Sequence, residues 1–150
     1  MKSLAEVIIR TVRREEISSV YEIERISFKQ PYPQSFLESL LIIAGDLFLV
    51  AKVKERVIGY AVALLRGGVL GHVISIAVHP DFRKRGVGAA LLKELLGKLR
   101  SKGAQFVRLE VRISNRAAIK LYKKFGFKEI YLVPNYYPDG EACYVMVKEL

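Results

Sequence analysis

A basic turn near the middle of the chain has the residue types that bind phosphate. It reads Arg83-Lys84-Arg85-Gly86-Val87-Gly88 and lies where a predicted strand ends and a predicted helix begins. Unpaired backbone N–H groups and the positive end of the helix dipole meet at such a junction. The two glycines carry no side chain that would keep the backbone away from phosphate oxygens. The turn therefore predicts a diphosphate site, although an ordinary basic turn can have the same composition.

Three other residues have side chains suited to proton transfer. Glu110 lies on a strand of a predicted parallel unit, where both faces of a sheet are usually covered, so it is either an exposed charge or a general base. Tyr122 shares a helix face with Asn115, where a tyrosine could simply pack in the core. His72 begins a strand and is either structural or a proton acceptor.

Two widespread phosphate-binding loops do not match this turn. A dinucleotide-binding loop would explain Gly86, Gly88 and an acid such as Glu110 about 20 residues further on. However, Leu91 replaces the third glycine of that loop, and the strand–helix–strand unit begins halfway along the chain. A Walker loop requires Gly-Lys-Ser or Gly-Lys-Thr, and neither follows the turn.

The hydrophobic pattern predicts the elements that position these residues. The strongest helix signal is a set of leucines that share one helix face: Leu91, Leu92, Leu95, Leu96 and Leu99. Further helices are predicted at residues 15–28, 34–44 and 114–125. Strands are predicted at residues 7–12, 47–53, 57–65, 72–78, 105–111, 127–133 and 142–147. Residues 72–111 thus contain a strand, a helix and a strand, which predicts a right-handed parallel crossover.

Composition limits the class of protein. A chain of 150 residues, 51% hydrophobic and 27% charged, fits one globular domain, residues 1–150, and no metal site is predicted. Its apolar runs are shorter than the about 20 residues that span a bilayer, so no membrane segment is expected. Residues 1–6 lack the apolar stretch of a secretory signal and Cys143 has no second cysteine, which indicates the cytoplasm. The net charge of +10 favours an anionic partner or ligand.

The motifs together resemble a known family. Residues 72–78, followed by the turn at 83–88, resemble the acetyl-CoA-binding core of the GNAT superfamily of acetyltransferases. Residues 109–122 and the segment Phe125-Gly126-Phe127 are similar to RimI-type enzymes and NatA catalytic subunits, including archaeal ones. The loop at residues 135–141 extends this similarity to N-terminal acetyltransferases. The resemblance implies an α/β (α+β) fold, with a mixed, mostly antiparallel sheet, a parallel βαβ core and helices on both faces.

The resemblance also implies acetyl-CoA as the cofactor and gives the site residues their roles. Glu110 would be the general base, His72 would accept a proton alone or through water, and Tyr122 would donate a hydrogen bond to the departing CoA sulfur. Asn115 would contact the pantetheine arm, unless it only starts its helix. Glu24 is a weaker candidate for the proton acceptor, because glutamates on such a helix are commonly solvated. The implied cofactor-binding residues are Ile76, Ala77, Val78, Arg83, Lys84, Arg85, Gly86, Val87, Gly88, Ala89, Asn115 and Tyr122.

The implied acceptor is the α-amine of a protein N-terminus, which would attack the thioester directly in a ternary complex. The pair Gln30-Pro31 replaces the Glu-Asn pair of the NatA subunits, which predicts a permissive pocket. Cys143 is expected to lie away from the site, so no acyl-enzyme is predicted. The residues expected to line the peptide cleft are Phe28, Tyr32, Tyr136 and Tyr137.

Two other functions remain open from the sequence. Lysine or small-amine acetylation could use the same fold, because a fold does not fix the acceptor. A basic module that binds RNA or the ribosome without catalysis is a function of a different class. The expected partners are protein N-terminal peptides, with the ribosome or an auxiliary subunit as further candidates, and neither a membrane nor a specific nucleic acid.

Overall fold

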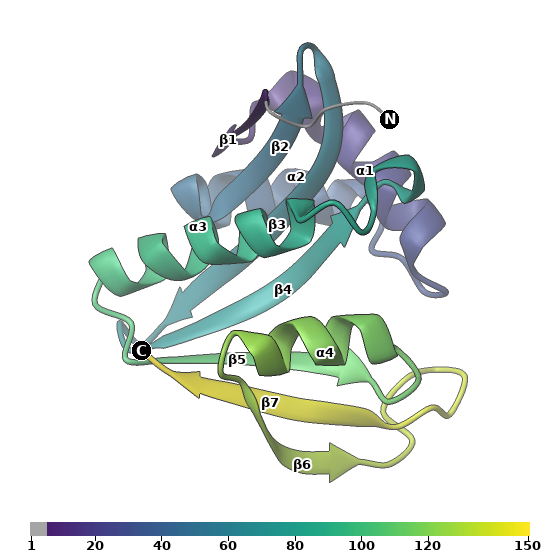
Figure 1. Cartoon of the computed structure of the whole chain (residues 1–150), viewed down its shortest axis with the longest axis vertical. Coiled ribbons are helices and arrows are strands. Elements are labelled where there is room, and N and C mark those ends of the chain that lie inside the picture. The colour runs from purple at the N-terminus through teal and green to yellow at the C-terminus, as the bar shows by residue number, and fades with distance from the viewer. Residues whose placement is uncertain (1–5) are drawn as a thin grey trace.

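One mixed sheet organises residues 6–150, which the computed structural model describes. Its strand order is β1-β2-β3-β4-β5-β7-β6, and among these strands only β4 and β5 are parallel neighbours (Figure 1). This is the mixed, mostly antiparallel sheet that the sequence predicts. The strands are β1 (Val7–Thr11), β2 (Phe48–Val53), β3 (Arg56–Arg66), β4 (Leu70–Val78), β5 (Phe106–Arg112), β6 (Lys128–Val133) and β7 (Cys143–Glu149).

Helices cover both faces of this sheet. In Figure 1, α1 and α2 lie behind the part of the sheet formed by β2, β3 and β4, whereas α3 lies in front of it and α4 lies in front of β5. The helices are α1 (Ile17–Ser27), α2 (Gln34–Ile43), α3 (Val87–Ser101) and α4 (Arg116–Lys124). Short 3-10 turns at Arg14–Glu16, Gly45–Leu47 and Pro80–Phe82 precede α1, β2 and the basic turn.

The predicted leucine face of α3 anchors that helix in the core. Leu91, Leu92, Leu95 and Leu99 are fully buried, and Leu96 is 6% exposed. Each fully buried leucine stabilises the fold by about 1.5–3 kcal/mol relative to an exposed one. A Cβ at Gly71 of β4 would lie 2.9 Å from Leu99 Cδ1, so the small residue lets helix and strand approach closely. This close approach fixes the C-terminal end of α3 against the start of β4.

The parallel pair β4–β5 is much shorter than the predicted crossover suggests. Its registered pairs join only Leu70–His72 of β4 to residues 106–108 of β5. Beyond His72 the two strands separate, while β4 stays paired with β3 as far as Val78. The β5-facing edge of residues 73–78 therefore has no neighbouring strand among the described residues, and an opening forms between β4 and β5.

The remaining elements match the prediction with small shifts. The antiparallel hairpin β2–β3 is confirmed, with Lys54 in the left-handed region at φ 53°. The helix predicted at 15–28 divides into the 3-10 turn at Arg14–Glu16 and α1, and α4 begins two residues later than expected, after Asn115. The segment 1–5, part of the stretch for which no secretory signal was predicted, lies outside the described residues. Within residues 6–150, no helix is both long and apolar enough to cross a membrane.

A buried ion cluster fixes β1, β2 and the start of α1 to one another. Glu16 is only 7% exposed and accepts hydrogen bonds from Arg10 Nη1 at 2.9 Å, Arg10 Nη2 at 2.6 Å and the Arg13 backbone N–H at 2.9 Å. Lys52 Nζ of β2 lies 2.9 Å from its second oxygen. Burial raises the pKa of Glu16, but the hydrogen bonds from Arg10, Lys52 and Arg13 outweigh it and lower that pKa from 4.5 to about 2.

We expect Glu16 to make folding stability depend on acid pH. Because the folded pKa is depressed, its stabilisation is fully present above pH 4.5 and is lost as the pH falls toward 2. A shift of this size corresponds to about 3 kcal/mol. Glu16→Gln should lower the free energy of unfolding by about 2–3 kcal/mol at pH 7 and flatten its fall between pH 5 and 2, measured by urea denaturation. The exposed neighbour provides the control, Glu15→Gln, and an equal loss in both variants would contradict this role.

Candidate active site

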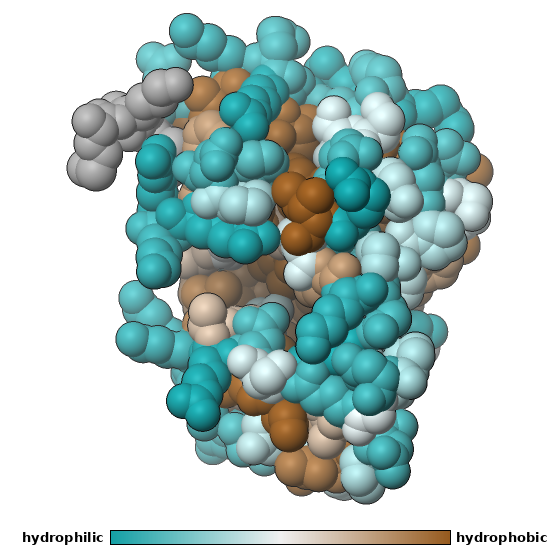
Figure 2. All heavy atoms as spheres, turned by 90° about the vertical axis from the view of Figure 1, so that its right-hand side faces the viewer, coloured by the Kyte–Doolittle hydropathy of each residue, from teal (hydrophilic) through white to brown (hydrophobic). Residues whose placement is uncertain are grey.

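The opening between β4 and β5 contains a pocket of about 180 Å³. It is closed on one side by the segment between α1 and α2 and on another by the loop between β6 and β7. Figure 2 looks onto this side of the molecule and shows a recess between its upper and lower halves, with hydrophobic atoms at its bottom. The lining residues that carry the argument below are Glu24, Ser75, Glu110, Arg112, Asn115 and Tyr122.

A second cavity of about 230 Å³ adjoins the first pocket. The two share Phe28, Ile76 and Asn115 as lining residues. The second cavity extends along the unpaired edge of β4 toward Arg83 at the basic turn. Five of the predicted cofactor-binding residues therefore line it: Ile76, Ala77, Val78, Arg83 and Asn115.

The basic turn has a backbone shape that suits an anion. Lys84 and Gly86 adopt left-handed conformations, with φ of 61° and 83°, and Gly86 is the N-cap residue of α3. A Cβ at Gly86 would meet nothing within 4 Å, so the backbone conformation, not a lack of space, favours glycine there. The first intrahelical bond is made by the Ala90 N–H, which leaves the N–H groups of residues 87–89 without an intrahelical acceptor.

The side chains of the turn have different surroundings. Lys84 and Arg85 are exposed, and the Arg85 guanidinium lies 5.8 Å from the centre of the Phe82 ring. Arg83 instead donates to the Val78 carbonyl at 2.8 Å and to Ser27 Oγ at 3.2 Å, so it also ties the turn to β4 and α1. Val87 is 3% exposed, which leaves its backbone N–H, not its side chain, to meet a ligand.

These features fit the predicted acetyl-CoA. Free N–H groups and two exposed cations at the turn suit a diphosphate. The open edge of β4 offers backbone hydrogen-bonding groups to an amide-containing arm that runs from the turn into the first pocket. Asn115 caps α4, because its Oδ1 accepts from the Ala118 N–H at 3.2 Å, and it lines both cavities as well. The helix-capping interpretation of Asn115 is therefore confirmed, and its Nδ2 faces no described hydrogen-bond partner and stays available to a ligand.

Glu110 and His72 form a polar pair on neighbouring strands. His72 Nε2 lies 2.7 Å from Glu110 Oε1, and Arg108 Nε donates to Glu110 Oε2 at 2.7 Å. Burial raises the pKa of Glu110, but the hydrogen bonds from His72 and Arg108 outweigh it and lower that pKa below its usual 4.5. Glu110 is therefore held as an anion that faces the pocket.

His72 has no free ring nitrogen in this arrangement. Arg66 Nε donates to His72 Nδ1 at 3.1 Å, which leaves Nε2 as the nitrogen that donates to Glu110. Glu110 lines the pocket, whereas His72 is not among its described lining residues. This geometry favours an orienting role for His72 over the predicted role of proton acceptor.

Glu24 is a pocket residue to which the sequence interpretation gave too little weight. The expectation that it is solvated is wrong, because Glu24 is only 2% exposed. Its carboxylate accepts hydrogen bonds from the Tyr60 hydroxyl, from Ser75 Oγ at 2.8 Å and from the Tyr32 backbone N–H at 3.0 Å. Its spacing from Ile17 and Val20, which are also buried, places it on the inner face of α1 and could have revealed its position.

Tyr122 lies in the wall of the pocket with a hydroxyl that is free for a ligand. The residue is 6% exposed, and no hydrogen bond to another described residue engages its hydroxyl. Since every fully buried side-chain polar atom of the described residues has a partner, this hydroxyl must open to the pocket. Burial raises the pKa of Tyr122 above its usual 10, so the phenol stays protonated and acts as a hydrogen-bond donor.

The four residues predicted to line a peptide cleft all line this pocket. Phe28 and Tyr32 come from the segment between α1 and α2, and Tyr32 packs on Phe36 with ring centres 4.7 Å apart. Tyr136 and Tyr137 come from the loop between β6 and β7, with ring centres 4.9 Å apart and nearly perpendicular planes. Two chain segments far apart in sequence thus form one aromatic wall.

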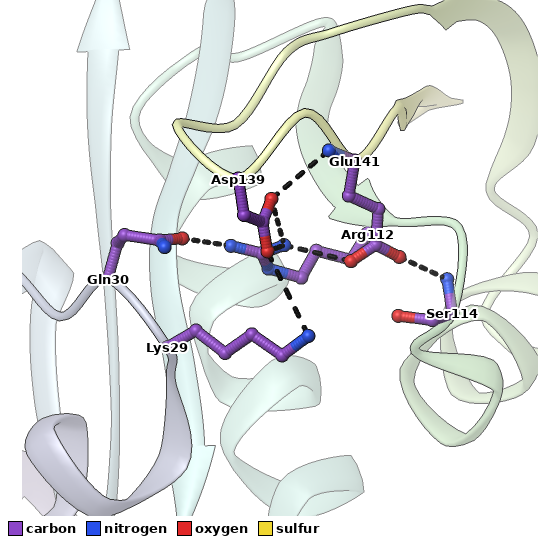
Figure 3. Close-up of polar contacts among 6 residues, drawn as sticks. All are labelled: Lys29, Gln30, Arg112, Ser114, Asp139 and Glu141. Atoms are coloured by element: carbon purple, nitrogen blue, oxygen red, sulfur yellow. Dashed lines mark hydrogen bonds and ion pairs between the residues drawn. The ribbon is translucent and has the colours of Figure 1, made fainter.

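One residue of β5 lines the site, and one of β7 lies beside it, in a way that was not predicted. Arg112, at the end of β5, lines the pocket and contacts both wall segments (Figure 3). Cys143 is paired with Arg112 in the sheet, so it lies closer to the site than expected. Its thiol is fully buried, and burial raises its pKa, so it remains unsuited to carry an acyl group.

Comparison with known proteins identifies the family to which this chain belongs. Residues 17–127 match the acetyltransferase (GNAT) family. An uncharacterised N-acetyltransferase of Methanocaldococcus jannaschii is 38% identical over 95% of this chain and 92% of its own length. An N-alpha-acetyltransferase of Sulfurisphaera tokodaii is 36% identical over the same shares. The crystal structure of Ard1 from Thermoplasma volcanium superposes with a TM-score of 0.93, at 34% identity over 96% of this chain and 97% of that one. The chain therefore belongs to the GNAT family of acetyltransferases.

Proposed function

We propose that this protein transfers an acetyl group from acetyl-CoA to the α-amine of protein N-termini, by direct attack in a ternary complex. The observation that carries the proposal is the aromatic pocket at the separated ends of β4 and β5, which contains two carboxylates and the free hydroxyl of Tyr122. The relatives named for N-alpha-acetylation cover nearly the whole chain, which supports the same acceptor.

The proposed roles of the cofactor-binding residues follow from their positions. Acetyl-CoA supplies the acetyl group as an activated thioester. The N–H groups of residues 87–89, with Lys84 and Arg85, hold the diphosphate, and the open edge of β4 at Ile76 to Val78 binds the pantetheine arm. Tyr122 donates a hydrogen bond to the departing sulfur. Its raised pKa makes full proton transfer to a thiolate unfavourable, so it stabilises the leaving group mainly by hydrogen bonding.

The two carboxylates act on the amine. Glu110, held as an anion by His72 and Arg108, attracts the terminal ammonium and receives its proton directly or through water. Glu24 contacts only hydroxyl and amide donors, and it orients the amine from the opposite side. A weak base is sufficient, because an α-amine with a pKa near 8 is roughly one-tenth neutral at pH 7. A lysine amine is neutral about once in several thousand molecules.

The cellular compartment and the partners of the reaction are part of the same proposal. A lone buried cysteine is compatible with a reducing cytoplasm, and protein N-terminal peptides are the proposed partners. The ribosome and an auxiliary subunit remain candidate partners, since the excess of 25 basic over 15 acidic residues suits an anionic surface. Lysine acetylation is the alternative enzyme function, and a non-catalytic RNA-binding module is the alternative from another class.

We expect CoA and acetyl-CoA to raise the melting temperature. A ligand at 100 times its Kd stabilises a fold by about 2.7 kcal/mol. Gly86→Glu should abolish the shift, because it places a carboxylate beside the diphosphate and strains a left-handed position. Gly97→Glu on the exposed face of α3 is the matched control and should keep the shift. Equal stabilisation by NAD, or none by acetyl-CoA, would refute the cofactor assignment.

Removal of the proposed catalytic groups should slow turnover without weakening cofactor binding. Tyr122→Phe and Glu110→Gln should each lower kcat by about ten- to a thousandfold, because both groups act in the transition state. The acetyl-CoA affinity, measured by calorimetry, should change less than about threefold. Tyr131→Phe, at a tyrosine that is 61% exposed, should have wild-type activity. Wild-type turnover in Tyr122→Phe and Glu110→Gln would show that both residues have only a structural role.

The acceptor can be tested with two peptides. One has a free N-terminus and no lysine, and the other has a blocked N-terminus and one lysine. With excess acetyl-CoA, we expect mass spectrometry to detect acetylation of the first peptide at a rate at least about tenfold higher, because its amine is more often neutral. Ser, Ala and Thr termini should react, and Met-Leu termini as well, since Gln30 stands in place of an acid and suggests a permissive pocket. Faster acetylation of the blocked peptide would indicate a lysine acetyltransferase.

A further inference from the structure

One guanidinium joins the two segments that wall the peptide pocket. Arg112 Nη1 donates to Asp139 Oδ1 at 3.1 Å, to Asp139 Oδ2 at 2.9 Å and to Glu141 Oε1 at 2.8 Å, all in the β6–β7 loop. Its Nη2 donates to Gln30 Oε1, in the segment between α1 and α2. Figure 3 shows Arg112 at the centre of this cluster, with Gln30 on one side and Glu141 on the other.

The cluster also fixes the aromatic wall and the start of the next helix. The Arg112 guanidinium lies 4.0 Å from the centre of the Tyr137 ring, which suits a cation–π contact. Glu141 Oε2 accepts from the Ser114 backbone N–H at 2.9 Å, next to the Asn115 cap of α4. The orientation of Tyr137 is therefore coupled to the same side chain that holds Gln30.

Arg112 is the stronger of two polar links between the segments. The other is Lys29 Nζ to Asp139 Oδ2, at 3.8 Å, where the lysine side chain is 69% exposed. An exposed, single-point ion pair of this length contributes little. The Arg112 side chain is 13% exposed, and its planar fork makes several directed bonds to partly buried acceptors.

We infer that Arg112 is a positioning residue that couples the two wall segments, so that they order together and set the affinity for the acceptor peptide. The inference rests on the proposed function for its substrate, but the coupling itself is a property of the free protein. Arg112 needs no contact with the reacting atoms for this role. Its loss should weaken peptide binding and leave cofactor binding, at the far end of β4, intact.

The coupling can be measured by hydrogen exchange in the absence of any substrate. Asp139→Asn lies in the β6–β7 loop and should speed amide exchange in residues 28–33 by about tenfold, whereas Lys29→Ala, which removes only the direct ion pair to Asp139, should not. Gln30→Ala changes only the other segment and should speed exchange in residues 134–142. Arg112→Lys, which keeps the charge but loses the fork, should speed exchange in both. Arg100→Lys, at an exposed position of α3, is the matched control and should change neither.

Steady-state kinetics then tests the consequence for the substrate. Arg112→Lys should raise the KM for a free-N-terminus peptide about tenfold, with the KM for acetyl-CoA changed less than about twofold and kcat changed less than about threefold. Unchanged exchange in the distant segment of both single-loop variants, or an unchanged peptide KM in Arg112→Lys, would overturn the inference. If Arg112→Lys does not fold, Asp139→Asn and Gln30→Ala decide it by the same two measurements. A wild-type protein that acetylates no peptide α-amine would refute the proposed function, while exchange would still report on the coupling.

Discussion

The separation of β4 from β5 after only three registered pairs is the constraint on which the site depends. A strand interior normally satisfies its backbone N–H and C=O groups through both neighbours, and unsatisfied buried groups are costly. Here β4 keeps β3 on one side and leaves its other edge free over residues 73–78. That edge connects the basic turn, at the end of β4, to the pocket that contains Glu110. One departure from regular pairing thus produces both cavities of the candidate site.

The core holds this open structure in place. The buried leucines of α3 fix the helix against β2, β3 and β4, so the N–H groups at its first turn point in a constant direction. A binding site made of backbone groups needs such support, because its geometry depends on the rigidity of the elements and not on side-chain rotamers. The left-handed Gly86 lies between strand and helix and makes the change of direction without strain.

The two carboxylates of the pocket have contrasting surroundings, which gives them different chemistry. Glu110 is paired with basic side chains, and the resulting fall in its pKa maintains the negative charge near the acceptor amine. Glu24 is almost fully buried and contacts the hydroxyls of Tyr60 and Ser75 and the backbone N–H of Tyr32. Enzymes commonly obtain distinct roles from similar groups through such differences in environment. A third charged group, Arg112, has another role: it orders the two segments of the aromatic wall and does not act on the reacting atoms.

Local patterns in the sequence determined much of this description. The leucine spacing of α3, the position of the basic turn at the start of that helix, the β2–β3 hairpin and the alternation along β5 are each set by neighbours within a few residues, and each is confirmed. The sheet class, the pocket residues Phe28, Tyr32, Tyr136 and Tyr137, and the position of Tyr122 also agree with what the family resemblance implied.

Only the tertiary structure decided the remaining features, because their partners are distant in sequence. Glu24 is buried by Ser75, which lies 51 residues away, and Gln30 meets Arg112 across 82 residues. Hydrophobic periodicity placed Glu24 on a helix, but it could not reveal which polar groups would surround it. The same limit applies to the β4–β5 opening, because a strand–helix–strand pattern predicts that two strands pair in parallel but not over how many residues they stay paired. Local sequence fixes the elements through short-range sterics and periodicity, whereas burial, charge pairing and strand separation arise when those elements pack together.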